Sequence, residues 1–233
     1  MIRPALTLRR RRILVDVDVQ NDMFLADGKM CVRNHRRVLA NIRRVMAWTR
    51  RQRIRQISLA IVHDPGRHSN NGQYCVAGSE GVRKVHYTMR DRHIDFGDNA
   101  GTDLPRQLLQ DYTQVILYRH TEDPFEQPRI DRLFSETRAT EFIVVGSLAE
   151  GAVRLLVLGL LVRKRMVTLV SDALGNRDKA AAEVALRQMQ AKGAKIVDTK
   201  NLFGTSHLRM VYACPCDRCR GKLLKAGIEE GVC

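Results

Sequence analysis

The 233-residue chain is long enough to bury one sizeable core, and 44% of its residues are hydrophobic, which excludes a disordered protein. No apolar run approaches the roughly 18 residues of a membrane helix, and an apolar stretch beginning at Ile13 leaves no room for a signal peptide. We therefore expect a cytoplasmic protein with no membrane partner. The formal charge of +15 favours a polyanionic or acidic partner, unless it reflects only a solvated basic surface.

Strand-like and helix-like segments alternate along the chain, a pattern typical of a parallel sheet covered by helices on both faces. Aliphatic and β-branched runs predict strands at 13–19, 57–62, 115–117, 142–145, 167–170 and 194–197. Apolar spacing predicts helices over about 35–53, 130–134, 151–163 and 179–192, the last capped by Gly193. The polar stretch from 64 to about 104 is expected to be a long loop.

The extent of this alternation of strands and helices divides the chain into three parts. Residues 1–12 form a basic N-terminal arm, residues 13–204 a single α/β domain, and residues 205–233 a basic extension rich in cysteine. Six cysteines in a chain of this length do not suggest a disulfide framework, so a reducing compartment is expected.

Four motifs, in order and spacing, resemble the isochorismatase superfamily of cysteine hydrolases, which includes the nicotinamidases. Residues 13–24 (ILVDVDVQNDMF) are similar to its first-strand motif, and 65–69 with 74–81 to the metal-site loop of nicotinamidases. Residues 144–153 (VVGSLAEGAV) resemble its nucleophile turn, and 171–178 the segment that follows. The resemblance implies a three-layer α/β/α, Rossmann-like domain with a mostly parallel sheet of about six strands, assembled as a dimer or tetramer.

The resemblance also implies three catalytic positions, and only one holds the family's residue. The general-base aspartate falls on Asp18, whereas the cysteine nucleophile falls on Ala152 and the lysine on Arg119. A methyl group cannot attack a carbonyl, and an arginine is effectively never deprotonated. We therefore expect a catalytically inactive pseudoenzyme that acts as a ligand-binding or scaffold protein. The alternative is an active hydrolase of small amides with a non-standard site, for which Cys75 is the candidate nucleophile.

The metal loop also lacks some of the metal-binding residues that the family resemblance implies. The family's ligands would fall on Val62, Asp64, His68 and Tyr74, and only Asp64 and His68 remain able to bind a metal. His63 could substitute for a missing ligand, or Asp64 and His68 could simply bond the loop backbone.

Two features lie outside the resemblance. Arginine pairs repeat every seven residues on the first predicted helix and form one stripe opposite its apolar face: Arg36, Arg37, Arg43, Arg44, Arg50 and Arg51. The stripe is a candidate polyanion site for RNA, a ribonucleoprotein or an acidic protein, or else a basic face without a partner. Near the C-terminus, Cys214, Cys216 and Cys219 predict a zinc site, completed by His207, Cys233 or another chain, unless they are free or redox-active thiols.

Overall fold

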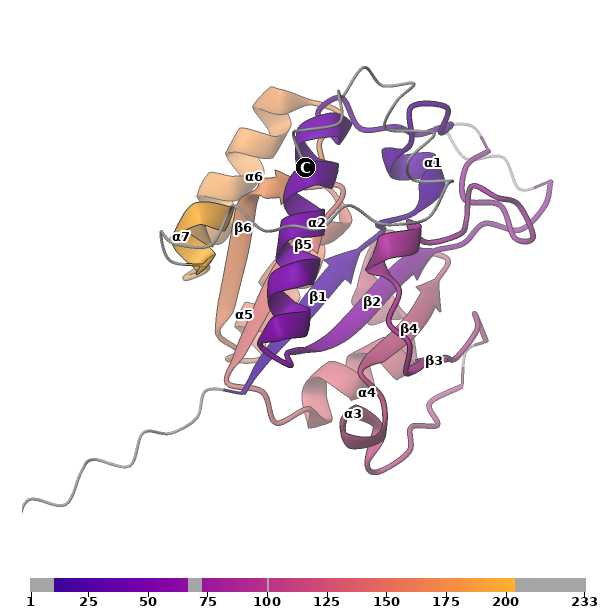
Figure 1. The fold of residues 1–233 in the computed structure, drawn as a ribbon, viewed down its shortest axis with the longest axis vertical. Helices are drawn as coiled ribbons and strands as arrows, with labels where there is room; N and C mark the ends of the chain where they lie inside the picture. Colours follow the sequence, from indigo (N-terminus) through magenta and orange to yellow (C-terminus); the bar gives the residue numbers. More distant parts are fainter. Residues whose placement is uncertain (1–10, 67–72, 100, 204–233) are drawn as a thin grey trace, which may run out of the picture.

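The structure is a computed structural model, and it describes residues 11–66, 73–99 and 101–203. Its centre is a seven-stranded sheet in the order β3-β4-β2-β1-β5-β6-β7, and every neighbouring pair is parallel (Figure 1). The strands are β1 (Arg12–Val17), β2 (Arg55–Ile61), β3 (His93–Asp95), β4 (Gln114–Arg119), β5 (Glu141–Gly146), β6 (Val167–Leu174) and β7 (Lys195–Val197).

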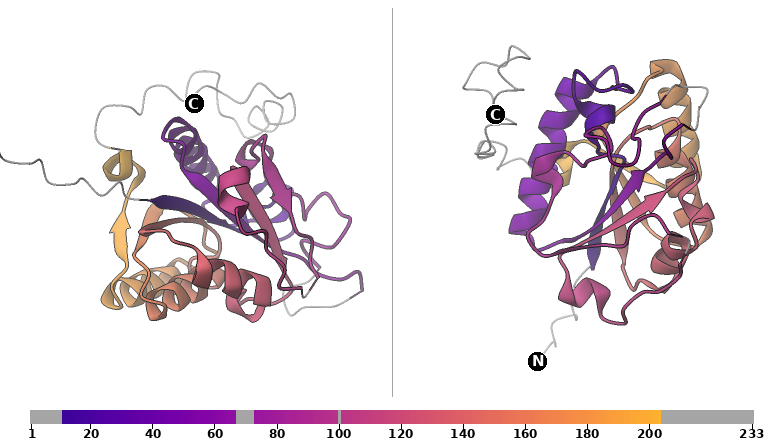
Figure 2. Two further views of the ribbon diagram at one scale, coloured as in Figure 1. Left: turned by 90° about the horizontal axis from the view of Figure 1, so that it is seen from below. Right: turned by 90° about the vertical axis from the view of Figure 1, so that its right-hand side faces the viewer.

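Helices cover both faces of this sheet (Figure 2). One face carries α2 (His35–Arg51) with α7 (Thr199–Phe203), and the other carries α4 (Pro128–Glu136), α5 (Ala152–Val162) and α6 (Lys179–Ala191). The shorter elements are α1 (Asn21–Phe24), η1 (His86–Thr88), α3 (Leu108–Asp111) and η2 (Pro124–Glu126). The arrangement confirms the predicted three-layer α/β/α class.

Alternate residues of the central strands fill two apolar cores, one on each face of the sheet. Val15 and Val17 of β1 pack toward α5 and α6, whereas Leu14 packs toward α2. Because both faces are covered, the strands are nearly continuous apolar runs, which is why their composition predicted them. Asp16 is the exception within β1, and its buried carboxylate has partners described below.

All six predicted strands and four predicted helices are present, with ends that differ by a few residues. The structure adds a seventh strand, β3, inside the stretch predicted to be an irregular loop. Three residues with little burial carry too weak a pattern for sequence prediction, and the strand forms by pairing with β4 at the sheet edge. Among the helices that the structure describes, none is long and apolar enough to cross a membrane.

Candidate functional site

Asp18 lies at the point where the central strand β1 ends, and the residue is only 3% exposed. Its backbone has a left-handed conformation with φ of 48°, and its amide donates to the Leu59 carbonyl at 2.8 Å. The neighbouring strand therefore holds the backbone in place while β1 gives way to the following turn. Carboxyl ends of parallel strands are where α/β folds place their ligand sites.

Arg119 lies at the end of β4 and forms a buried ion pair with Asp18. Its Nη2 donates to Asp18 Oδ2 at 2.5 Å, its Nη1 donates to the Thr121 carbonyl, and the residue is 1% exposed. The other carboxylate oxygen, Oδ1, is buried without a hydrogen-bond partner. The structure therefore brings together two of the three predicted catalytic positions, and it leaves one acceptor of Asp18 unused.

Burial raises the pKa of Asp18 to about 6, because removing a carboxylate from water disfavours its charged form. The positive charges of Arg119 and Lys84 oppose this shift without cancelling it. Asp18 therefore changes protonation close to neutral pH, which is a property of groups that exchange protons with a ligand.

The third predicted position, Ala152, is the first residue of α5, directly after the turn that follows β5. This turn runs beside the Asp18 backbone: the Ser147 amide donates to the Val17 carbonyl at 2.9 Å, and its Oγ bonds the Asp18 carbonyl at 3.4 Å. Gly146 permits the approach, since a Cβ there would lie 2.0 Å from the Val17 oxygen and φ is +117°. The start of α5 thus lies next to the turn that contacts the end of β1, with the methyl group of Ala152 at its first position.

Glu122 also reaches this turn, although nothing in the sequence indicated it. A Cβ placed on Gly151 would lie 2.4 Å from Glu122 Oε1, so the carboxylate rests against the backbone at the start of α5. The Glu122 charge also contributes to a raised pKa at Tyr74. The site therefore carries a second carboxylate close to the helix N-terminus.

Cys75, the candidate alternative nucleophile, lies near enough to Asp18 to feel its charge. Its side chain is fully buried, and burial, reinforced by the charges of Asp18 and Asp22, raises the pKa of its thiol far above the usual range. Its amide donates to Asp22 Oδ2 at 2.7 Å, which fixes the loop to α1. A thiol held in its neutral form is a small apolar side chain.

Lys84 is a further member of the site that the sequence did not single out. Its ammonium forms a buried ion pair with Asp16, whose other oxygen accepts from Gln56 at 2.8 Å. Gln20 places this loop, because its side-chain nitrogen donates to the carbonyls of Ile61 and Val82 at 2.8 Å each. The available signal was Asp16 itself, since a carboxylate inside an apolar strand requires a buried partner.

The family model of the Isochorismatase domain matches residues 12–201. The chain belongs to the isochorismatase family. Solved structures agree on the fold: an isochorismatase family protein from Desulfovibrio vulgaris subsp. vulgaris str. Hildenborough has a TM-score of 0.66 at 20% identity, covering 83% of this chain and 96% of its own.

A pyrazinamidase of Pyrococcus horikoshii in complex with zinc has a TM-score of 0.62 at 21% identity, covering 81% of this chain and 99% of its own. A nicotinamidase from Bacillus subtilis has a TM-score of 0.63 at 14% identity, with coverage of 81% and 99%. At these identities the likeness concerns the fold. No match was found among functionally curated proteins.

Two of the four ligand positions predicted in the metal loop, Val62 and Tyr74, do not offer a metal ligand in the described part of this isochorismatase-family chain. Val62 is apolar and buried, and burial raises the pKa of Tyr74 to about 12, so its phenol keeps its proton. Asp64 is exposed, and His68 lies outside the described residues. Within residues 11–66, 73–99 and 101–203, no three His, Cys, Asp or Glu side chains form a cluster able to hold a metal ion.

The arginine stripe on α2 is divided by the structure. Arg36, Arg37 and Arg51 are exposed, in the positions expected of a charged surface, and Arg50 is exposed as well although it has contacts with the protein. The other three contact the protein: Arg43 lies over the Tyr87 ring at 4.9 Å, Arg44 donates to Asn41 at 3.0 Å, and Arg50 donates to the Tyr87 carbonyl at 2.7 Å. Half of the predicted stripe therefore has a structural role. The predicted zinc ligands Cys214, Cys216 and Cys219 lie outside the described residues, and that site stays a prediction.

Proposed function

We propose that this chain is a non-catalytic member of the isochorismatase family that retains its strand-end site for binding a small ligand. The proposal depends on two departures from the residues that the family resemblance implies, one at the cysteine position and one at the lysine position. A methyl group, Ala152, begins the helix where the family's nucleophile is expected, and Asp18 is bound by the guanidinium of Arg119. Each change removes a different part of the expected chemistry.

Covalent amide hydrolysis by this family's route needs a thiolate close to a group that takes its proton. Ala152 cannot supply one, and the neutral, buried Cys75 does not replace it. Arg119 keeps the positive charge expected at the lysine position, but a guanidinium does not exchange protons near neutral pH. The proposal follows from these three side chains together.

What the site retains is a buried anchor for a ligand. Asp18 Oδ1 has no partner, and a buried acceptor gains stability when a ligand donates to it. With a pKa of about 6, Asp18 accepts a hydrogen bond as a carboxylate above that pH and can donate one below it. A small ligand with an N–H or O–H donor fits this arrangement.

The test is to assay the purified chain on nicotinamide and a panel of small amides. We expect no turnover, and turnover that disappears in an Asp18→Asn variant would overturn the proposal in favour of an active hydrolase. The same panel is screened for thermal stabilisation, which should be lost in Asp18→Asn and kept in the control Lys179→Gln on α6. Absence of any Asp18-dependent ligand from amine, amide and alcohol panels would count against a retained binding site.

A double variant, Ala152→Cys with Arg119→Lys, tests whether the rest of the site is intact. Restored amide turnover is the expected result, because the Gly146 turn and Asp18 still hold their positions. A folded double variant without turnover would indicate that the site has been reshaped beyond these two residues.

We further propose that the chain binds RNA through its basic surface. The formal charge of +15 supports this, because a large positive charge attracts the phosphates of RNA. Binding to a labelled RNA hairpin is expected to weaken steeply as salt rises, because counterions are released from phosphates on binding. Absence of binding at low salt would remove this function.

A further inference from the structure

The two ends of the sheet carry opposite charge. The connections that follow β1, β2, β4, β5 and β6 meet at the end where the candidate site lies (Figure 1). Their described residues hold more acidic than basic side chains: Asp18, Asp22, Asp27, Asp64, Glu80, Glu122, Asp123, Glu126, Glu150 and Asp178 against Lys29, Arg33, Arg83, Lys84 and Arg177. The connecting segments at the site end are therefore acidic in sum, although the whole chain is strongly basic and α2 begins at this end with Arg36 and Arg37.

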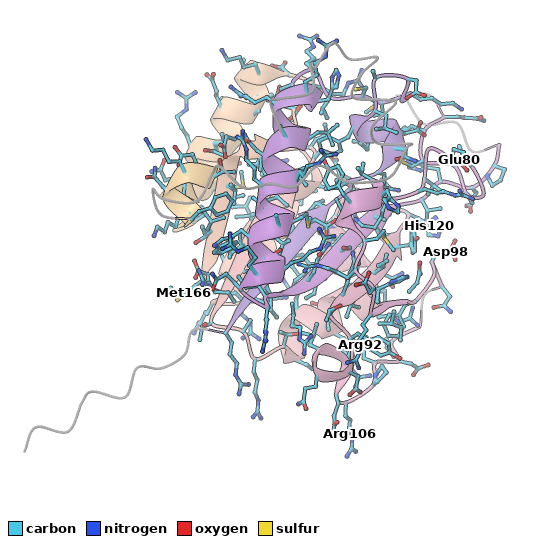
Figure 3. All side chains as sticks on the ribbon, viewed as in Figure 1. Glu80, Arg92, Asp98, Arg106, His120 and Met166 are labelled. Atoms are coloured by element: carbon cyan, nitrogen blue, oxygen red, sulfur yellow. The ribbon has the colours of Figure 1, made fainter. Side chains whose placement is uncertain are left out.

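At the opposite end, the connections that lead into the strands are almost purely basic. They hold one acid, Asp91, against nine basic residues: Arg11, Arg53, Arg90, Arg92, Arg138, Arg163, Lys164, Arg165 and Lys192. Figure 3 shows Arg92 and Met166 toward this end, well apart from Glu80 and His120. Among the connecting segments, positive charge is thus concentrated at the end farthest from the candidate site.

Five adjacent strands each have one exposed basic residue in the connection before them. In the spatial order β2, β1, β5, β6 and β7 these residues are Arg53, Arg11, Arg138, Lys164 and Lys192, which we call the basic row. Neighbouring strands lie about 4.8 Å apart, so the row extends over roughly 19 Å. Within residues 11–66, 73–99 and 101–203, the side chains of the five members form no hydrogen bond or ion pair, in contrast to Arg163, which pairs with Asp131 at 2.6 Å.

Helix dipoles explain only part of this pattern. α2, α4, α5 and α6 end here, so four of the five members follow a helix C-terminus, where a cation is favourable by about 0.3–1 kcal/mol. However, Arg53 and Lys164 have left-handed backbones, with φ of 52° and 57°, at positions where glycine is the favoured residue. Arg11 precedes a strand and follows no described helix. The helix dipoles also do not require that acidic residues be nearly absent from the connections that lead into the strands.

We propose that the basic row is the RNA-binding surface of this chain and that it contacts successive phosphates of one backbone. The inference rests on the proposed binding of RNA and moves its site from the α2 stripe to the amino ends of the strands. A line of cations over roughly 19 Å fits a phosphate chain, which carries charge at regular short intervals. The exposed apolar side chains beside it, Val162 and Met166, are not the aromatic or leucine-rich face that inserts into membranes.

This arrangement leaves the acidic site end facing away from the RNA. Because phosphate groups are repelled by the carboxylates around Asp18, the bound orientation is set by charge, and the ligand site stays open. The chain would then act as an adaptor, with RNA at one end of the sheet and a small ligand at the other.

The experiment compares two double variants with the same change in net charge. Lys164→Glu with Lys192→Glu reverses two members of the basic row, and Arg36→Glu with Arg37→Glu reverses two exposed arginines at the first turn of α2. Binding to a labelled RNA hairpin is measured by fluorescence anisotropy across a salt series, and thermal melts check that both variants fold.

The row variant is expected to lose more than about tenfold in affinity, with a salt slope smaller by about 2, one unit for each lost phosphate contact. The α2 variant should stay within about threefold of the parent chain. Equal or greater loss in the α2 variant would overturn the basic row while leaving RNA binding intact. No binding by the parent chain would instead remove the RNA function itself, and binding to phosphatidylserine vesicles but not to RNA would identify a membrane surface.

Discussion

Replacing Arg119 with methionine is expected to destabilise the protein by an amount that depends on pH. Methionine fills part of the same space without charge, so Asp18 loses its nearest counter-charge while its carboxylate stays buried. Leaving one member of a buried ion pair uncompensated can cost about 3–5 kcal/mol, but a carboxyl with a pKa of about 6 can take up a proton instead, which limits the loss near pH 7 to about 2–3 kcal/mol. That is a large fraction of the stability of a single domain, so the effect is measurable by denaturant unfolding.

The pH dependence follows from the raised pKa of Asp18. The folded protein holds this proton up to about pH 6, whereas an unfolded aspartate releases it near its ordinary value of 3.8. The stability contributed by this carboxyl therefore falls as pH rises from about 4 to about 6, because the folded state binds more protons in that window. Near pH 5 Asp18 is already mostly protonated, and the loss of Arg119 should then cost only about 1 kcal/mol, as for a neutral hydrogen bond.

Urea unfolding of the parent chain and of Arg119→Met, near pH 5 and above pH 7, measures this difference. A third protein, Asp18→Asn with Arg119→Met, has no carboxylate to titrate and should show nearly equal losses at both pH values. An equal loss of unfolding free energy in Arg119→Met at both pH values would show that Arg119 does not stabilise the ionised form of Asp18. That result would refute this account of the site.

Other regions give simpler expectations. Gly146→Ala should cost more than about 3 kcal/mol in unfolding free energy, because its Cβ would overlap the β1 backbone, whereas Gly78→Ala, also at positive φ but in open space, should cost about 1 kcal/mol. Cys75 should resist alkylation in the native protein and react only after denaturation, as peptide mass spectrometry would reveal; rapid native labelling would contradict its burial. Lys84→Met should lower the melting temperature strongly, since it leaves Asp16 unpaired, whereas the exposed Lys179→Met should change it little.

The layers of the fold could be predicted from the sequence because each strand and helix is indicated by the apolar pattern of its own segment. Strands buried on both faces need mostly apolar residues, and β1, β2, β5 and β6 have them apart from a few polar side chains such as Asp16. The edge strand β3 has no such requirement, so its three residues looked like loop. The same locality explains why α2 was placed within two residues of its C-terminal end.

The candidate site was predictable where it matched a motif and not elsewhere. Asp18, Arg119 and Ala152 were placed by their spacing from recognisable segments, and the first two indeed meet. Lys84 and Glu122 belong to no motif, and they join the site only because the chain returns to the same strand ends. The protonation behaviour of Asp18 also depends on burial, which no local pattern reveals.

By itself, the sequence determined the family, the alternation of strands and helices and a large positive charge. Only the tertiary structure decided where that charge lies, because a parallel sheet brings every strand's amino end to one side and every carboxyl end to the other. Residues as distant as Arg53 and Lys192 thereby enter one row, while Asp18 and Glu122 enter the opposite end. Electrostatic effects depend on separation in space, so their pattern appears only once the chain is folded.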